Sequence, residues 1–146
     1  MTGPIELLEQ INAQVNAIPY VATGSDDQED NWIDNPVPGQ VWQCRDYAIA
    51  KAKLMREQGW SVEQMGIVLC MTEIFSDPSF PDKPPARYYH AVQYARTGGL
   101  VYILDHRIVP NSVPLWKPYP LDYQWVHQEM VANGQMAWRD ASIGLV

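Results

Sequence analysis

The first part of the chain carries apolar side chains at helical spacing. They are Ile5, Leu8, Ile11 and Val15. Pro4 stands where the first turn of a helix tolerates proline, because the N–H that proline lacks would have no helical partner there. The pattern predicts an amphipathic helix from Pro4 to about Ile18 that packs on the core.

A second helical pattern begins at Cys44. Its apolar positions are Tyr47, Ala48, Ile49, Ala52, Leu54 and Met55. Gly59 follows the last of them and is placed to end the helix, which we expect to be mostly buried. Residues 23–40, between the two patterns, are acidic and rich in glycine and proline, which is typical of an irregular connection.

The hydrophobic period changes in the second half of the chain. Short β-rich runs take over, and they read MGIVLCMTEI (65–74), RYYHAVQYART (87–97), GLVYILDHRIV (99–109) and EMVANGQMAW (129–138). Gly98-Gly99 and Asn133-Gly134 favour tight hairpin turns. The pattern predicts an α+β fold with N-terminal helices packed on an antiparallel sheet. The proline-rich stretch 113–123 should be extended, either beside a functional site or only as a connection between strands.

Size and charge narrow the class of protein. The chain has 146 residues, 47% of them hydrophobic, which suits one globular domain spanning residues 1–146. The net charge of -7 and the pI near 4.7 argue against nucleic acid and anionic membranes as partners, since both attract basic surfaces. No apolar run is long enough to span a bilayer, and no secretion signal is visible. We therefore expect a cytoplasmic or phage-associated protein, or a periplasmic one if a leader has been removed.

Cys44 stands where the second helical pattern begins. The positive end of a helix dipole favours the thiolate, which is the form of cysteine that attacks carbonyl groups. The competing interpretation is structural, because free cysteine is among the most buried residue types. Cys70 fits that interpretation well, since it lies within an apolar run where a desolvated thiol is inert. We expect both cysteines to be reduced.

A nucleophilic cysteine needs a base, and the chain has three histidines. Pairing through Gly98-Gly99 brings His90 and Asp105 toward the same end of the predicted hairpin, where a carboxylate can orient an imidazole. A lone histidine on an apolar face is also a common core group, and Asp105 could equally form a turn or cap a strand. His106 should point to the opposite face from Asp105, and His127 lies on another strand. We expect these last two histidines to be structural or exposed.

Several segments resemble the bacterial transglutaminase-like cysteine peptidases, a family that includes a periplasmic protease that cleaves surface adhesins. In chain order they read INAQVNAIPYV, NWIDNP, CRDYAIAK with the following GW, HAVQYAR and GLVYILDHR, from about Ile11 to Arg107. The resemblance implies a papain-like or transglutaminase-like fold, in which a helix bearing cysteine packs against an antiparallel sheet bearing histidine and aspartate. It also implies that Cys44 is the nucleophile, His90 the general base and acid, and Asp105 the orienting carboxylate.

The implied reaction is thiol-dependent acyl transfer on a protein or peptide substrate. Cys44 attacks a carboxamide, His90 protonates the departing amine, and water hydrolyses the thioester. With an amine in place of water, the same site is a transglutaminase. The alternative, from a different functional class, is a catalytically inactive binding or structural module that keeps the fold. The backbone N–H of Cys44 is the natural first oxyanion donor, and the candidates for the second are Trp32, Gln40, Trp42 and Gln43.

The residues beside Cys44 depart from the resemblance. Adhesin-cleaving relatives commonly carry acidic residues on both sides of the cysteine, and these take part in a calcium site. Here the flanking residues are Gln43 and Arg45, and only Asp46 keeps a carboxylate. Calcium typically takes six to eight oxygen ligands with substantial negative charge. We therefore predict no metal site, no calcium requirement and no other cofactor.

Overall fold

The computed structural model describes residues 3–18, 44–76, 78, 81–108 and 112–146. Within these residues the helices are α1 (Pro4–Asn16), α2 (Cys44–Glu57) and a short 3-10 helix, η2 (Val62–Gln64). The strands that follow are β1 (Met65–Met71), β2 (Tyr89–Thr97), β3 (Leu100–Leu104), β4 (Gln124–Ala132) and β5 (Gln135–Asp140). The predicted α+β class, with helices first and antiparallel strands afterwards, is confirmed.

Helix α1 starts where the sequence predicts and ends at Asn16, slightly before the predicted Ile18. Pro4 occupies the first turn, and Glu6 places a carboxylate near the positive end of the helix dipole. The apolar stripe is buried at Leu8, Ile11 and Val15. The helix packs mainly on α2.

Helix α2 begins at Cys44 and ends before Gly59, as the pattern predicts. Gly59 has a φ of 94°, a left-handed conformation that favours glycine, and the Trp60 N–H returns to Met55 O at 3.1 Å. The buried face of α2 is wider than its apolar pattern, because it includes the charged residues Arg45, Asp46 and Lys51.

The strands form one five-stranded sheet in the order β3-β2-β1-β4-β5, in which every neighbouring pair is antiparallel. Thr97 pairs with Leu100 across Gly98-Gly99, and Ala132 pairs with Gln135 across Asn133-Gly134. All four turn residues have positive φ, which the tightest hairpin turns require. Both predicted hairpins are therefore confirmed.

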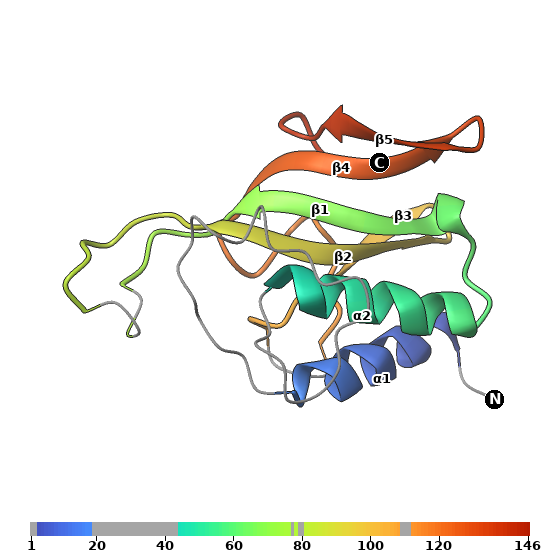
Figure 1. Cartoon of the computed structure of the whole chain (residues 1–146), viewed down its shortest axis with the longest axis horizontal. Coiled ribbons are helices and arrows are strands. Elements are labelled where there is room, and N and C mark those ends of the chain that lie inside the picture. Colours follow the sequence, from blue (N-terminus) through green and yellow to red (C-terminus); the bar gives the residue numbers. More distant parts are fainter. Residues whose placement is uncertain (1–2, 19–43, 77, 79–80, 109–111) are drawn as a thin grey trace.

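Both helices lie on one face of the sheet (Figure 1). Alternation along β1 separates two cores. Ile67 packs toward α2 with Cys44 and Ala48, whereas Val68 and Cys70 belong to the cluster on the other face. Segment 116–123 and the C-terminal residues cover that second face, where they contribute buried side chains such as those of Tyr123 and Leu145.

Candidate active site

Cys44 is the first residue of α2, and only 2% of its surface is exposed. It packs with Ala48 of the same helix and with Ile67 and Ala91 of the two strands beneath it. The first N–H groups of a helix have no partner within the helix, so backbone donors gather around this position. The predicted place of Cys44 at a helix start is confirmed, and its role as a nucleophile stays a prediction.

His90 and Asp105 meet at the end of the sheet where β2 begins and β3 ends. His90 is the second residue of β2, and Asp105 directly follows β3. The register Gln93 to Leu104 brings the two side chains together, and His90 Nε2 lies 2.8 Å from Asp105 Oδ1. An ionised carboxylate only accepts hydrogen bonds, so Nε2 carries the proton and Nδ1 is the ring nitrogen left for another partner.

The carboxylate of Asp105 accepts hydrogen bonds at both oxygens. Oδ1 also accepts from the backbone N–H of Arg107 at 3.0 Å. Oδ2 accepts from the hydroxyls of Tyr119 at 2.8 Å and Tyr123 at 2.7 Å. The bond to Arg107 is a local turn contact, so Asp105 both shapes the turn after β3 and meets His90. Sequence reasoning left these two roles as alternatives, and the structure contains both contacts.

Charge and hydrogen bonding set the proton affinities of this pair. Burial by itself lowers the pKa of His90, but the Asp105 charge and hydrogen bond outweigh it, and a hydrogen bond with the Cys44 side chain adds to the rise, giving a pKa of about 9. Burial raises the pKa of Asp105, but the His90 charge and hydrogen bond reverse this and bring it well below its usual range. At neutral pH the arrangement is an imidazolium beside a carboxylate, and the Cys44 side chain bonds the same imidazole.

Two further basic groups lie close to this pair. The ring of His106 stacks on Tyr47 and meets the His90 ring edge-on, with centroids 5.0 Å apart in both cases. Burial and the nearby His90 charge hold the pKa of His106 well below 6.5. Lys51 lies two turns after Cys44 on α2, and burial lowers its pKa to about 7 although Asp105 opposes the shift. His106, for which we expected a structural or exposed place, is thus a half-buried neighbour of the predicted pair.

A second ion pair stands behind Asp105. Arg107 donates to Glu73 through both terminal nitrogens, at 2.6 and 2.8 Å. Its Nη1 also donates to the hydroxyl of Tyr123 at 3.0 Å. Its guanidinium lies over the ring of Phe75, 4.6 Å from the centroid. A continuous chain of contacts therefore runs from Glu73 through Arg107 and Tyr123 to Asp105.

Of the remaining residues considered in the sequence, four lie outside the described part of the structure and two lie within it. Trp32, Gln40, Trp42 and Gln43, the candidates for a second oxyanion donor, lie outside the described residues. Cys70 is buried in the core of the opposite sheet face, and burial raises the pKa of its thiol, as its apolar context predicted. His127 is exposed on β4.

The described residues do not form a convincing metal centre. His90, Asp105 and His106 each offer one ligand atom, and these atoms lie within 4.8 Å of one another. Two of the possible ligand atoms, His90 Nε2 and Asp105 Oδ1, already share a hydrogen bond. Arg45 and Asp46, which follow Cys44, are both buried. A guanidinium has no acceptor atom and adds positive charge, so Arg45 does not fit a calcium site, although Asp46 keeps a carboxylate.

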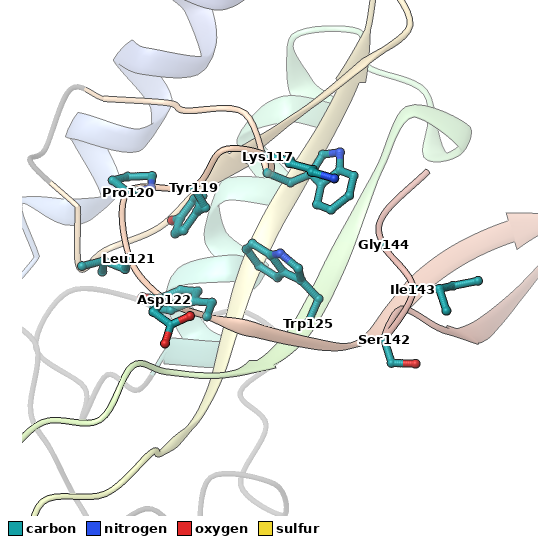
Figure 2. Close-up of a pocket in the computed structure, with 11 residues that line it drawn as sticks. Lys117, Tyr119, Pro120, Leu121, Asp122, Trp125, Ser142, Ile143 and Gly144 are labelled. Carbon is teal, nitrogen blue, oxygen red and sulfur yellow. The ribbon is translucent and has the colours of Figure 1, made fainter.

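A pocket of about 590 Å³ lies on the sheet face away from α2, lined by residues of the 116–125 stretch and by residues 142–144. Figure 2 shows Trp125 and Tyr119 at its wall, with Lys117 above them and Ile143 on the far side. The proline-rich segment therefore does more than connect β3 to β4. It lines this pocket and also supplies both tyrosines that bind Asp105.

The structure is similar in fold to calcium-bound LapG from Legionella pneumophila. The TM-score is 0.63 at 19% sequence identity, and the match covers 95% of this chain and 73% of the LapG chain. No protein-family model matches this chain, and no curated protein matches it in sequence. The likeness confirms the papain-like or transglutaminase-like fold that the sequence resemblance implies. None of the helices among the described residues is long and apolar enough to cross a bilayer.

Sequence reasoning missed four residues of this site: Lys51, Arg107, Tyr119 and Tyr123. The two tyrosines belong to an irregular segment, where no hydrophobic period predicts which side chains turn inward. Lys51 is a cation on a helix, a residue type that is almost never fully buried. The only available signal was the density of aromatic residues in 113–123, which is typical of core packing as well as of a site.

Proposed function

We propose that this chain is a cysteine peptidase or amidase of the transglutaminase-like kind, and that residues 1–146 form its single catalytic domain. The observation that carries the proposal is the 2.8 Å hydrogen bond between His90 Nε2 and Asp105 Oδ1, on an imidazole that also bonds the Cys44 side chain. A nucleophile, a base and a carboxylate that orients the base are the parts that thiol-dependent acyl transfer needs. The fold shared with LapG supports the same class.

The reaction would proceed in two steps. The Cys44 thiolate attacks the carbonyl carbon of a peptide or amide, and the C–N bond breaks as the His90 imidazolium gives its proton to the departing amine. This leaves a thioester on Cys44 and a neutral His90. His90 then takes a proton from water, which attacks the thioester and releases a carboxylic acid, and Cys44 returns to its starting state. The buried Asp105 stabilises the imidazolium form of His90 throughout.

An amine acceptor in the second step would make the enzyme a transglutaminase, and loss of the thiolate would leave a binding module with the same fold. Thiol reactivity separates the active arrangement from the inactive module. We expect iodoacetamide to label Cys44 well below about pH 8, where an ordinary thiol reacts slowly. His90→Ala should move this labelling to higher pH, while His127→Ala, the matched change at an exposed histidine, should leave it unchanged. Mass spectrometry resolves Cys44 from Cys70.

Incubation with a diverse peptide mixture tests the reaction itself. New peptide termini that are absent with Cys44→Ala support hydrolysis, and incorporation of a fluorescent primary amine supports transglutamination. Labelling of Cys44 that resembles that of an ordinary thiol and does not respond to His90→Ala would contradict the proposal and favour the binding module.

A further inference from the structure

The carboxylate of Asp105 is ionised although it is 1% exposed. Burial of a charge is costly unless hydrogen bonds and an opposite charge replace the lost water. His90 supplies the opposite charge, but it contacts only Oδ1. Oδ2 depends on the hydroxyls of Tyr119 and Tyr123. A carboxylate accepts about four hydrogen bonds, so the two tyrosines complete the set.

The same two hydroxyls fix the orientation of the carboxylate. Rotation of the Asp105 carboxylate away from His90 would break the bonds of Tyr119 and Tyr123, at 2.8 and 2.7 Å, at the same time. Both tyrosines act as donors because burial, followed by the Asp105 charge, raises their pKa values far above the neutral range. The orientation that points Oδ1 at His90 is therefore held from the opposite side.

Packing holds the phenol rings themselves in place. Tyr119 and Tyr123 have centroids 5.1 Å apart, and each meets the ring of Trp125, at 5.2 and 5.7 Å. Figure 2 shows Tyr119 beside Trp125 on the pocket wall. Arg107, held by Glu73, donates to the Tyr123 hydroxyl at 3.0 Å and strengthens it as a donor. Little conformational freedom is left to either hydroxyl.

We infer that Tyr119 and Tyr123 are positioning residues of the proposed reaction, which act by holding Asp105 ionised and aimed at His90. The inference rests on the proposed function, because it assigns these tyrosines to the same site. The ring of Tyr123 also meets the His90 ring edge-on, with centroids 5.6 Å apart, and Tyr123→Phe keeps that contact. Their effect reaches the thiol through Asp105 and His90.

Other charged and titratable groups also surround Asp105, and they must be kept constant in any test. They are His106 after β3, Lys51 from α2, Cys70 from β1, Arg107 and Glu73. Replacing the tyrosines by phenylalanine keeps all of these groups and the ring packing, and removes only the two hydroxyls.

The decisive measurement is the titration of His90 by NMR in the whole chain labelled with ¹⁵N-histidine, with the His90 signal assigned from His90→Gln. We expect the Tyr119→Phe and Tyr123→Phe double variant to lower the pKa of His90 by about one unit or more, because Asp105 becomes a weaker and less ordered partner. Tyr94→Phe is the matched control. It removes a buried hydroxyl that bonds Glu129 O, in the same core cluster but away from Asp105.

An unchanged or raised His90 pKa in the folded double variant would overturn the inference, even if the variant had lost stability. If the double variant does not fold, each single variant decides in the same way, with a fall in the His90 pKa expected in both. The titration needs no substrate. A fall of the pKa in a chain whose Cys44 labels like an ordinary thiol and does not respond to His90→Ala would therefore refute the proposed function alone. Labelling of Cys44 that does respond to His90→Ala, without the fall, would refute the role of the tyrosines alone.

Discussion

Replacing Asp105 with asparagine tests the electrostatic basis of the site. The change removes one negative charge and keeps the shape of the side chain. The amide oxygen can still accept from His90 Nε2, and the hydroxyls of Tyr119 and Tyr123 can rotate to accept from the amide nitrogen. Loss of charge, rather than loss of volume, is therefore the main perturbation.

The size of the effect follows from the pKa of His90, which is about 9 instead of the ordinary 6.5. The difference corresponds to a few kcal/mol, about 1.4 kcal/mol per pKa unit, of extra stabilisation of the imidazolium. Burial is the largest single influence on His90 and acts in the opposite direction. Because burial remains when the charge is gone, we expect the pKa of His90 in Asp105→Asn to fall below 6.5, by more than that difference.

The same NMR titration measures this shift, and Asp122→Asn is the control, since it makes the same change at an exposed carboxylate paired with Arg87. We also expect alkylation of Cys44 at neutral pH to slow by about tenfold or more, because a neutral His90 no longer stabilises the thiolate. A His90 that still titrates near pH 9 in Asp105→Asn would refute the reasoning.

The raised pKa of His90 also determines how the stability of the fold depends on pH. A raised pKa of His90 means that its pair with Asp105 contributes stability that is complete below about pH 6.5 and is lost as the pH rises through about 9. In urea unfolding, the free energy of unfolding of the wild-type chain should fall between these two pH values. In Asp105→Asn it should change less over the same range.

Three further predictions concern Lys51, Gly66 and calcium. Lys51 has a lowered pKa of about 7, so its burial opposes folding fully below that pH and less as the pH rises toward 10.5. Lys51→Met should therefore stabilise the chain by a few kcal/mol at about pH 6, of the order of the Lys51 pKa shift, and by less at about pH 9. Urea unfolding at the two pH values measures the difference, and an equal gain at both would contradict this prediction. A Cβ at Gly66 would lie 2.8 Å from Glu129 O and 2.8 Å from a Tyr94 ring carbon. We expect Gly66→Ala to lower the free energy of unfolding by about 1–3 kcal/mol. Gly3→Ala should cost less, because its added Cβ meets nothing and only a favoured N-cap residue is lost. Calcium or a chelator should change neither the melting temperature nor the labelling of Cys44, and a clear response to either would show that the buried Arg45 does not prevent calcium binding.

Local rules predicted the parts of this fold that depend on neighbouring residues. The start of α2 at Cys44 follows from helical spacing, and its end from the glycine at 59. The Gly98-Gly99 turn then fixes the register of β2 and β3, and with it the approach of His90 to Asp105. These contacts were predictable because a hairpin of known turn length leaves one register.

Contacts between distant segments could not be predicted in the same way. No pattern within the strands says that β1 pairs with both β2 and β4, since pairing partners depend on the packing of the whole sheet. Tyr119 and Tyr123 reach Asp105 from an irregular segment. The helical pattern of α2 predicted its apolar face, but the burial of Lys51 depends on charges that the sheet brings near it.

The two cysteines lie on opposite faces of the sheet. Cys44 packs on the helix side of β1, and Cys70 of β1 lies in the core of the other face. Because the strand stands between them, a disulfide that joins these two thiols would require the sheet to open. The chain has no other cysteine. If a peroxide oxidises Cys44 to a sulfenic acid, no internal thiol can resolve it, and recovery depends on a small thiol or a reductase that reaches the site from outside.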